Sequence, residues 1–499
     1  MQVDYSGFGG GVHLKGYGAI CVGGSVQAPL HVADRGIAGC SVDLVASGTT
    51  LAAAGGMSKT RRTSLDASID ATVETTTGFP TPRFRPHARG RTAPRNPAAQ
   101  GRVAPLLPLP AGPFRPPHCP NRHCPFYEPS PQWRFVLWGF YQAPSCSKPL
   151  RRFRCLECDR TFTGRTFAVT YWLHHWDLLA YIATLSVAGS GVRQIARSLG
   201  VAHSTVARHL TRAARCCLLR HQELLAGAVL TEPVVVDGFE TFEHSQYFPY
   251  HANLAAGKES WFLYHFTDSP LRRKGRMTAK QQARRTELEQ ELGRPDPQAV
   301  EKGIYELLRA IVRLVPRPPQ PGAAESLGAG SHQATAGSGE LEWHSDDHPA
   351  YPRAARRLAG ESGVPRLRHQ VTPSTDARTP ANPLFAVNLA DLLLRHCGAN
   401  HRRETIAYDR RRQGGMERLA IFLVWRNAIK WRREKEPGET AAMRAGILTR
   451  GWSWRDVFRC RLFPRERQLP GVWWDYYWRR VRTAALGDRQ TENRARYAF

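Results

Sequence analysis

The segment Thr231-Glu-Pro-Val-Val-Val-Asp-Gly-Phe-Glu-Thr-Phe242 carries a run of three valines that ends in a carboxylate. Three consecutive Val between a Pro and a Gly predict a short strand buried on both faces, with Asp237 at its C-terminal end. Taken alone, an acid after such a strand is more often a turn residue than a catalytic one. The interpretation of Asp237 therefore depends on the acids that follow it in the chain.

The elements after this strand alternate between strand and helix. Strands are predicted at 250–256, 260–267, 341–346 and 367–372, and helical patterns at 277–315, 349–358, 388–396 and 404–433. Three strands followed by alternating helices and strands predict an α/β fold, an RNase H-like catalytic domain over residues 229–440 whose mixed sheet is flanked by helices. Residues 271–338 are expected to form a helical insertion in that domain, ending in a Pro- and Gly-rich loop.

Two acids can join Asp237 in such a domain. Asp346 follows the strand at 341–346, and Glu404 opens the helix predicted at 404–433. Neighbouring strands would place the two aspartates side by side, and carboxylates are the ligands that Mg²⁺ or Mn²⁺ needs for two-metal phosphodiester chemistry. Arg411 would lie on the same helix face as Glu404, where it can hold a phosphate.

Each of these acids also has an ordinary explanation as a solvated surface charge. Asp268 and Asp347 show how easily another carboxylate can be chosen. The pattern of residues alone leaves these alternatives open.

Charge gives an independent indication of the partner. Lys and Arg number 70 against 42 Asp and Glu, so the formal net charge is +28 and the pI is near 10.3. An excess of this size suits a polyanion, because each neutralised phosphate releases counterions. Double-stranded DNA is the expected partner, and a solvated basic surface or tail is the alternative.

Four of the eleven cysteines are placed in pairs, Cys119-x4-Cys124 and Cys155-x2-Cys158. Pairs of this kind around two short strands predict a zinc ribbon at 113–175, in which Zn²⁺ replaces a core that is too small to hold itself. Free buried thiols are the alternative. The nearby residues Cys146, His118 and His123 are possible substitute ligands.

Residues 176–228 are helical by period and contain a helix-turn-helix pattern around Gly200. Apolar positions form one face before this glycine, and Val201, Val206 and Leu210 would pack the second helix back. The second helix would present a set of polar side chains to a DNA major groove, namely His203, Ser204, Thr205, Arg208 and His209. A helical hairpin that binds no DNA is the alternative.

The two ends of the chain differ from this central part. Residues 1–112 are rich in Gly, Ala, Pro and Arg and are expected to be disordered, whereas 441–499 are rich in aromatics and Arg. Helical spacing of Trp473, Tyr477 and Val481 favours packing on the catalytic core over contact with single strands. No apolar run or signal peptide is evident, so a cytoplasmic, nucleoid-associated protein is expected.

The sequence also resembles a known family. The motifs that carry the resemblance are Cys155-Leu-Glu-Cys158-x-Arg-Thr-Phe-Thr163, Asp237-Gly-Phe-Glu-Thr-Phe-Glu-x-Ser-Gln-Tyr247, His344-Ser-Asp-Asp-His-Pro-Ala-Tyr351, Asn382-Pro-Leu-Phe-x-Val-Asn388 and His401-Arg-Arg-Glu-Thr-Ile-Ala-Tyr408. Together they resemble bacterial insertion-sequence transposases of the DDE type, which have an N-terminal zinc ribbon and a helix-turn-helix. The match spans about residues 117–480.

The resemblance implies a set of roles. Asp237, Asp346 and Glu404 would be the catalytic triad with Mg²⁺, the four paired cysteines would bind zinc, and the protein would act on its element's terminal inverted repeats and on target DNA. Asp346 is preferred to Asp347 because it comes first after the strand, as in similar transposases. Other residues near the site can replace or supplement a ligand, namely His344, Asn388, Asn400 and His401.

Two functions follow as hypotheses. The first is a transposase that cuts and joins DNA strands, assembled as a homodimer or larger oligomer on paired ends. The second is a non-catalytic DNA-binding regulator, a domesticated or inactive transposase whose catalytic fold serves as a scaffold. The three acids favour the enzyme.

Overall fold

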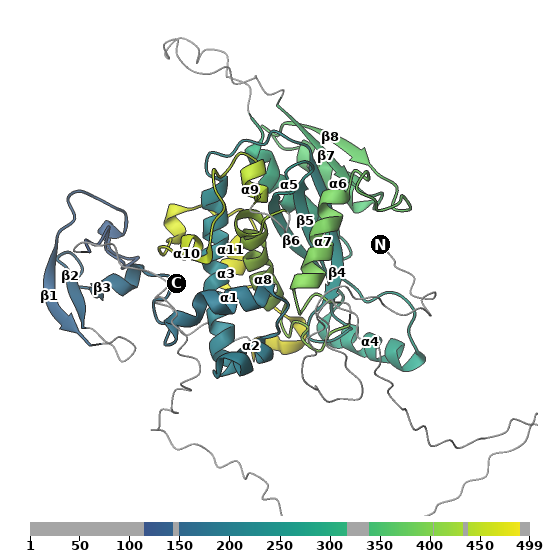
Figure 1. Cartoon of the computed structure of the whole chain (residues 1–499). Helices are drawn as coiled ribbons and strands as arrows, with labels where there is room; N and C mark the ends of the chain where they lie inside the picture. Colours follow the sequence, from purple (N-terminus) through teal and green to yellow (C-terminus); the bar gives the residue numbers. More distant parts are fainter. Residues whose placement is uncertain (1–113, 143–148, 317–338, 403, 433–437, 490–499) are drawn as a thin grey trace, which may run out of the picture. The chain divides into compact units, whose positions relative to one another are not determined.

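The structure is a computed structural model that describes residues 114–142, 149–316, 339–402, 404–432 and 438–489 (Figure 1). The segment 1–112, Cys146 and most of the loop predicted at 316–339 lie outside the described residues. The described part is a mixed α/β protein, which confirms the predicted class. None of its helices combines the length and the apolarity needed to cross a membrane.

A small antiparallel sheet opens the described chain. It consists of β1 (Phe135–Tyr141), β2 (Leu150–Cys155) and β3 (Thr161–Thr163) in that order. We call residues 114–167 the Cys module. Its core is a few aromatic rings around the cysteines, with Trp133, Phe153 and Phe162 buried. A core of this size supplies little stability by itself.

Three helices follow: α1 (Leu179–Val187), α2 (Val192–Leu199) and α3 (His203–Leu225). Gly200 ends α2 with φ +63°, a left-handed conformation that glycine adopts without strain, and the chain turns there into α3. Every residue of α3 from 209 to 221 is buried. The second half of α3 is therefore a core helix rather than part of a separate DNA-binding domain.

The central sheet has five strands in the order β6-β5-β4-β7-β8. Their bounds are Val234–Phe242 for β4, Pro249–Gly257 for β5, Leu263–Pro270 for β6, Glu340–Ser345 for β7 and Arg366–Val371 for β8. Strands β4, β5 and β6 pair antiparallel, and β7 and β8 join them in parallel. The β-branched run at 234–236 thus forms the middle strand of the sheet, as its burial on both faces predicts.

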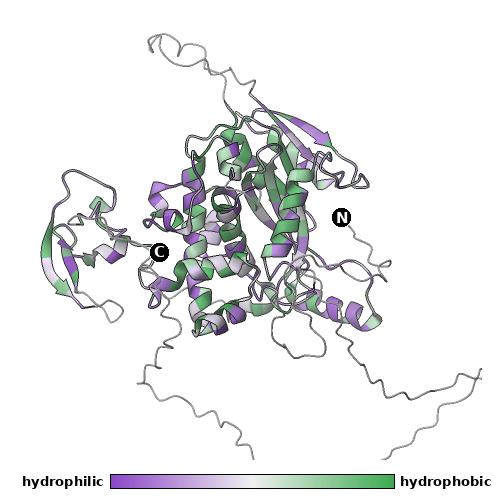
Figure 2. Ribbon diagram, in the orientation of Figure 1, coloured by the Kyte–Doolittle hydropathy of each residue, from purple (hydrophilic) through white to green (hydrophobic). Residues whose placement is uncertain are grey.

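Alternate residues of β4 belong to different cores because successive side chains of a strand point to opposite faces. Val235 packs in one core with α7 (Phe385–Cys397) and α8 (Arg412–Val424). Val234 and Val236 pack in the other with α5 (Ala299–Ile311) and α6 (Ala350–Ala359). Helices therefore cover both faces of the sheet, and in Figure 2 β5 and β6 are largely apolar whereas β8, at the edge, is hydrophilic.

The predicted helical insertion at 271–338 is only partly correct. Helix α4 (Ala279–Leu292) buries none of its residues and is mostly hydrophilic (Figure 2). Helix α5, in contrast, buries Ile304, Leu307 and Leu308 against the sheet and α6, so it is an integral layer of the fold. Because the sequence before α5 is charged, the whole region was predicted to be an insertion, although α5 is an amphipathic helix with one side in the core.

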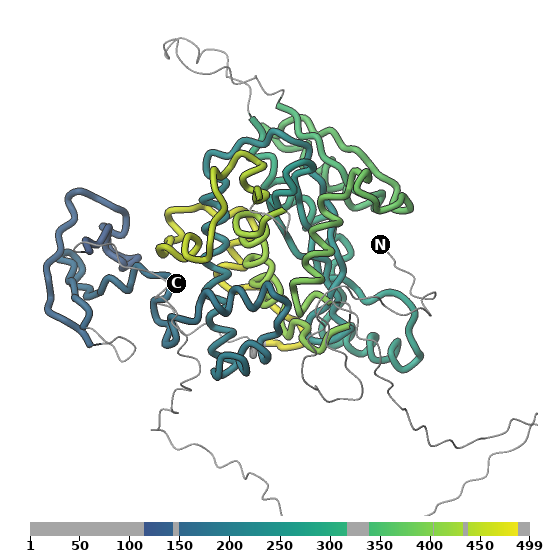
Figure 3. The backbone as a smooth tube through the Cα atoms, viewed as in Figure 1, coloured from purple at the N-terminus to yellow at the C-terminus, as the bar shows by residue number. Residues whose placement is uncertain are grey.

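The C-terminal segment returns to α3 along the trace in Figure 3, through α9 (Ala441–Arg444), α10 (Trp454–Val457) and α11 (Trp473–Trp478). Trp473, Tyr476 and Tyr477 are buried in the core that contains α3 and α8. This agrees with the expectation that the aromatic segment packs rather than projects.

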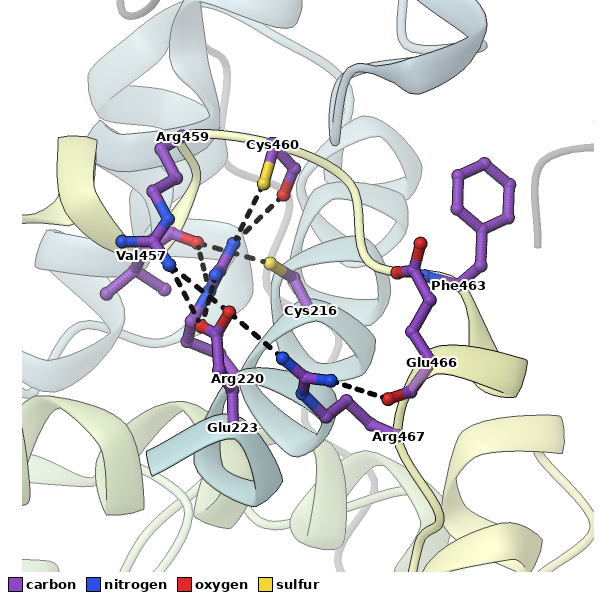
Figure 4. Close-up of polar contacts among 9 residues, drawn as sticks. All are labelled: Cys216, Arg220, Glu223, Val457, Arg459, Cys460, Phe463, Glu466 and Arg467. Atoms are coloured by element: carbon purple, nitrogen blue, oxygen red, sulfur yellow. Dashed lines mark hydrogen bonds and ion pairs between the residues drawn. The ribbon is translucent and has the colours of Figure 1, made fainter. Parts of the chain in front are cut away.

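Ion pairs fasten the C-terminal segment to the end of α3 (Figure 4). Glu223 accepts from Arg220 of its own helix and from Arg459 and Arg467, at 3.2 and 3.5 Å for the latter two. Buried Arg220 also donates to the carbonyls of Val457 and Cys460, at 3.2 and 3.0 Å. Because these contacts join residues more than 230 positions apart, α3 and the C-terminal segment form one unit.

Candidate functional sites

The first candidate site lies where β4 passes the end of β7. Val235 of β4 pairs with His344 of β7, so Asp237 stands beside the position of Asp346, just after β7 ends. Asp237 was predicted at the end of its strand, but β4 continues to Phe242. Asp237 nevertheless lies just beyond the residues of β4 that pair with β7. Burial, and then the negative charge of Asp346, raise the pKa of Asp237. The two aspartates are therefore neighbours.

A third acid approaches from helix α7. Burial and the charge of Asp237 raise the pKa of Asp391 well above its usual value. Within the described residues, Asp391 Oδ1 is buried with no hydrogen-bond partner, and the same holds for Asn388 Oδ1 one turn earlier on α7. A buried carboxylate oxygen without a donor is costly, and a bound cation is one way to satisfy it.

Glu404 does not occupy the predicted place. It is exposed in a bend well before α8, which begins at Arg412 rather than at residue 404. Arg411 has extended backbone angles as the residue that precedes α8, so the two residues share no helix face. The helix assigned to 404–411 is wrong, since the apolar run that predicted it starts only after Gly415.

Gly415 explains where that helix can pass. A Cβ at this position would come within 2.4 Å of Tyr250 Oη and 2.6 Å of Asp409 Oδ2, so the close approach of α8 to β5 needs a glycine. Helix α8 runs unbroken through Gly414 and Gly415, from Arg412 to Val424.

The structure also separates the alternatives for the second acid. Asp346 Oδ1 accepts from the His348 amide at 3.0 Å and acts on Asp237, whereas Asp347 is exposed and turns to Ser374. Asp268 is paired with the Arg412 guanidinium at 2.6 Å. Asp346 is thus the acid that faces the site.

The other alternative ligands have partners elsewhere. His344 lies 3.2 Å from Glu342, and the Asn400 amide donates to Asp409 at 2.7 Å. Burial lowers the pKa of His401 to about 3, so its ring is neutral in the core. Of that group only Asn388 lies on the helix that carries the third acid.

Three further side chains complete the surroundings of the acids. Tyr351 Oη of α6 lies 3.4 Å from Asp237 Oδ1 and is buried. The positive charge of exposed Arg378 lowers the pKa of both Asp237 and Asp391, against the larger effect of burial. His251 of β5 acts on Asp237 in the same direction. The cluster therefore has a buried side and a cationic, solvent-facing side.

The second candidate site is the cysteine cluster. The sulfurs of Cys119, Cys124, Cys155 and Cys158 all lie within 4.8 Å of one another, and no other acid, Cys or His group of the described residues does so. The distances are 3.6 Å from Cys119 to Cys158 and 3.9 Å from Cys124 to Cys155. Tetrahedral Zn–S bonds of about 2.3 Å require sulfurs about 3.8 Å apart. The donor set and its spacing fit zinc.

The thiols differ in their readiness to ionise. Burial raises the pKa of Cys119 far above its usual value and that of Cys124 to about 11. At Cys155 burial acts the same way, but the Trp133 indole N–H, which donates to Cys155 Sγ at 3.3 Å, and nearby backbone N–H groups lower the pKa to about 7. His118 and His123 lie outside the cluster, His118 bonding the Cys119 carbonyl instead.

The third candidate site is the start of α3. His203, Ser204 and Arg208 are exposed and Thr205 is half-buried, as a groove-facing helix requires. His209 is buried, with its ring nitrogens 2.8 and 2.7 Å from the carbonyls of Thr205 and His175. His209 is therefore a packing residue, and its prediction as a groove contact is wrong for this conformation.

One comparison with known proteins bears on these sites. Residues 180–213 match a family model described as a helix-turn-helix domain, a family typical of transposase-type proteins. The match covers most of α1, all of α2 and the first half of α3. No curated protein matches the chain. The chain therefore carries a DNA-binding helix-turn-helix, and its chemistry has to be inferred from the sites.

Proposed function

We propose that this protein is a transposase-type enzyme that binds DNA ends through its helix-turn-helix and cuts and joins DNA strands at the carboxylate cluster. The observation that carries the proposal is the convergence of three carboxylates from separate elements, Asp237 of β4, Asp346 after β7 and Asp391 of α7. In this assignment Asp391 takes the role that was predicted for Glu404.

The topology supports the proposal. Three antiparallel strands continued by two parallel ones, with helices on both faces, is the arrangement expected of an RNase H-like domain. In a mixed sheet of this kind, side chains from the middle strand and from the end of its parallel neighbour meet at one edge. Asp237 and Asp346 occupy these two places.

The residues fit divalent metal ions of the Mg²⁺ or Mn²⁺ type. Their donors are hard carboxylate oxygens, and one of them, Asp391 Oδ1, is buried and unsatisfied within the described residues. Such ions, when bound, activate an attacking hydroxyl and stabilise a leaving oxygen. Asp237, which interacts with both Asp346 and Asp391, would be the ligand that the three acids share in holding such ions.

The chain's own residues divide the remaining work. Tyr351 fixes the Asp237 carboxylate from the buried side through its hydroxyl. Arg378, on the solvent side, can bind a phosphate of the strand that enters. The exposed face of α3 holds duplex DNA by its groove, and the excess of Arg over the chain adds affinity that salt weakens.

Strand cleavage tests the proposal directly. Purified protein is incubated with DNA carrying the inverted repeats that flank its gene, with Mg²⁺ or Mn²⁺, beside Asp237→Ala. We expect wild type to nick the end and join its 3′-OH to target DNA, and the variant to bind the same DNA without cutting it. Equal binding by both proteins with no cut strand under either metal would instead favour the non-catalytic regulator.

A further inference from the structure

The exposed face of the Cys module is unlike the rest of the described surface. Of the thirteen large hydrophobic residues with high exposure, six belong to this module, namely Val136, Leu137, Trp138, Phe140, Tyr141 and Leu156. Five of them come from the single strand β1. An apolar edge strand of this kind is a liability unless a partner covers it.

The register shows how these side chains are presented. Phe135 and Phe153 face the aromatic core, and Val136 pairs with Arg154 on the opposite face. Gly139, with φ +74°, lies in a bulge between Leu137 and Phe140, and Phe140 is 65% exposed. The bulge changes the alternation of β1, so that Phe140 lies on the same side of the sheet as Phe153, whereas Tyr141 lies on the side of Val136.

Arginine accompanies these rings. The Arg154 guanidinium lies 4.5 Å from the centroid of the Trp138 ring, which is 46% exposed. Arg152 lies two residues before Arg154 on β2 and so on the same face, whereas exposed Arg151 pairs with Phe140 on the other face. On the adjoining turn Asp159 pairs with Arg154 at 2.5 Å, and Glu157 is the other acid, so the three arginines of β2 leave a small positive excess.

We propose that this face, which we call the β1 platform (Val136, Trp138, Tyr141, Arg152 and Arg154), binds single-stranded nucleic acid by stacking unpaired bases on its aromatic rings. Bases stack on exposed aromatics whatever their sequence, and arginines beside them neutralise the backbone. Duplex DNA hides the faces of its bases, so it gains little from these rings. A second copy would bring like charges together, which charge complementarity disfavours.

The platform adds to the proposed function without depending on it. The exposed side chains of α3 face a duplex groove, and the platform would hold strands that have lost their pairing, such as those at an opened DNA end. Single-strand binding at the platform is measured without any cleavage. Loss of the platform proposal would therefore leave the enzyme proposal standing, and loss of the enzyme proposal would leave the platform standing.

The test compares two probes on the full-length protein. Fluorescence anisotropy follows an oligothymidylate of about 16 nucleotides, at the upper end of single-strand site sizes, and a blunt duplex of matched length. We expect Trp138→Ala/Tyr141→Ala to weaken oligothymidylate binding by about tenfold to a hundredfold, the loss expected for one or two stacked bases. Duplex binding should be unchanged.

Two controls keep the result interpretable. Trp172→Ala removes a 58% exposed indole outside the module and should leave both affinities unchanged. The zinc content of the double variant, compared with wild type, shows whether the module is intact. Unchanged oligothymidylate binding, an equal loss for duplex, or a change only in self-association would each overturn the proposal.

Discussion

The cysteine cluster and the carboxylate cluster are both groups of possible metal ligands, but they differ in how closely the fold brings their ligand atoms together. The four sulfurs are gathered within 4.8 Å of one another, close to the spacing that one tetrahedral ion needs. The three carboxylates come from β4, from the residue after β7 and from α7, and Asp237 is repelled by Asp346 and repels Asp391. A closed site suits a metal that holds structure, and an open one suits metals that must also hold a substrate.

Loss of a cysteine ligand should have the largest effect on the molecule. Cys155→Ser leaves three thiolates, and because structural zinc supplies about 10 kcal/mol or more of folding free energy, the Cys module should unfold. Zinc stoichiometry and the near-ultraviolet circular dichroism of the module's aromatics report this. Cys460→Ser changes an exposed thiol outside the cluster and should do neither; an intact module in the Cys155 variant would contradict a structural role.

Loss of a carboxylate should abolish chemistry and leave the fold intact. Asp391→Asn should lower the rate of strand cleavage by more than about a hundredfold, because even residues that only support a metal ligand contribute about 10- to 100-fold. Glu404→Gln is the matched control and should cut like wild type, since Glu404 is exposed in a loop. The reverse pattern would restore the triad predicted from the sequence.

The repulsion among the acids should appear in stability. The pKa of Asp237 is raised, so in metal-free protein its charge destabilises the fold above that pKa, and the penalty fades as pH falls toward the ordinary aspartate value of about 4. Asp237→Asn should therefore raise Tm in chelator at about pH 8 by a few degrees, since roughly 1 kcal/mol corresponds to about 2–4 °C. The gain should shrink near pH 5.

Added Mg²⁺ provides the control for this experiment. It should raise the Tm of wild type and leave the Asp237→Asn variant unchanged, because only the charged cluster gains from a cation. Asp347→Asn, at an exposed neighbour, should behave as wild type under both conditions. A Tm gain that does not depend on pH would show that the carboxylate is not under electrostatic strain.

The smallest effects should come from the groups that support the ligands. Trp133→Phe removes the 3.3 Å N–H···S bond to Cys155, and Tyr351→Phe removes the 3.4 Å contact to Asp237. We expect a loss of zinc affinity of about tenfold for the first and a smaller loss of Mn²⁺ affinity for the second, whose contact is long. Competition with a chelating dye measures zinc, and electron paramagnetic resonance measures Mn²⁺.

The sequence allowed much of this arrangement to be predicted, and the misses have physical causes. The cysteine pairs could be predicted because the two cysteines of each pair are only a few residues apart in the chain, so their sulfurs also lie close together in the structure. Asp391 was missed because its signal is positional: it is half-buried on α7, four residues after buried Val387 and three before buried Leu394. An acid beside the apolar side of an amphipathic helix was the available clue.

Tertiary packing explains the other differences. His209 looked like a groove residue because it follows Arg208 on a basic helix, but α3 enters the core at that point. In the same way α5 was taken for an insertion, although its apolar side covers the sheet. Local pattern indicated that these helices exist, and only the packing of distant elements determined which sides they bury.

The continuity of α3 limits how this protein can evolve new DNA specificity. The helix begins with exposed His203 and Ser204 and ends clamped at Glu223 by arginines from the C-terminal segment. A helix-turn-helix borrowed from another protein would have to bring a second half that fits this core. Exchange of the whole helix-turn-helix with another protein is therefore disfavoured. New target sites are expected to arise by single substitutions on the first turns of α3.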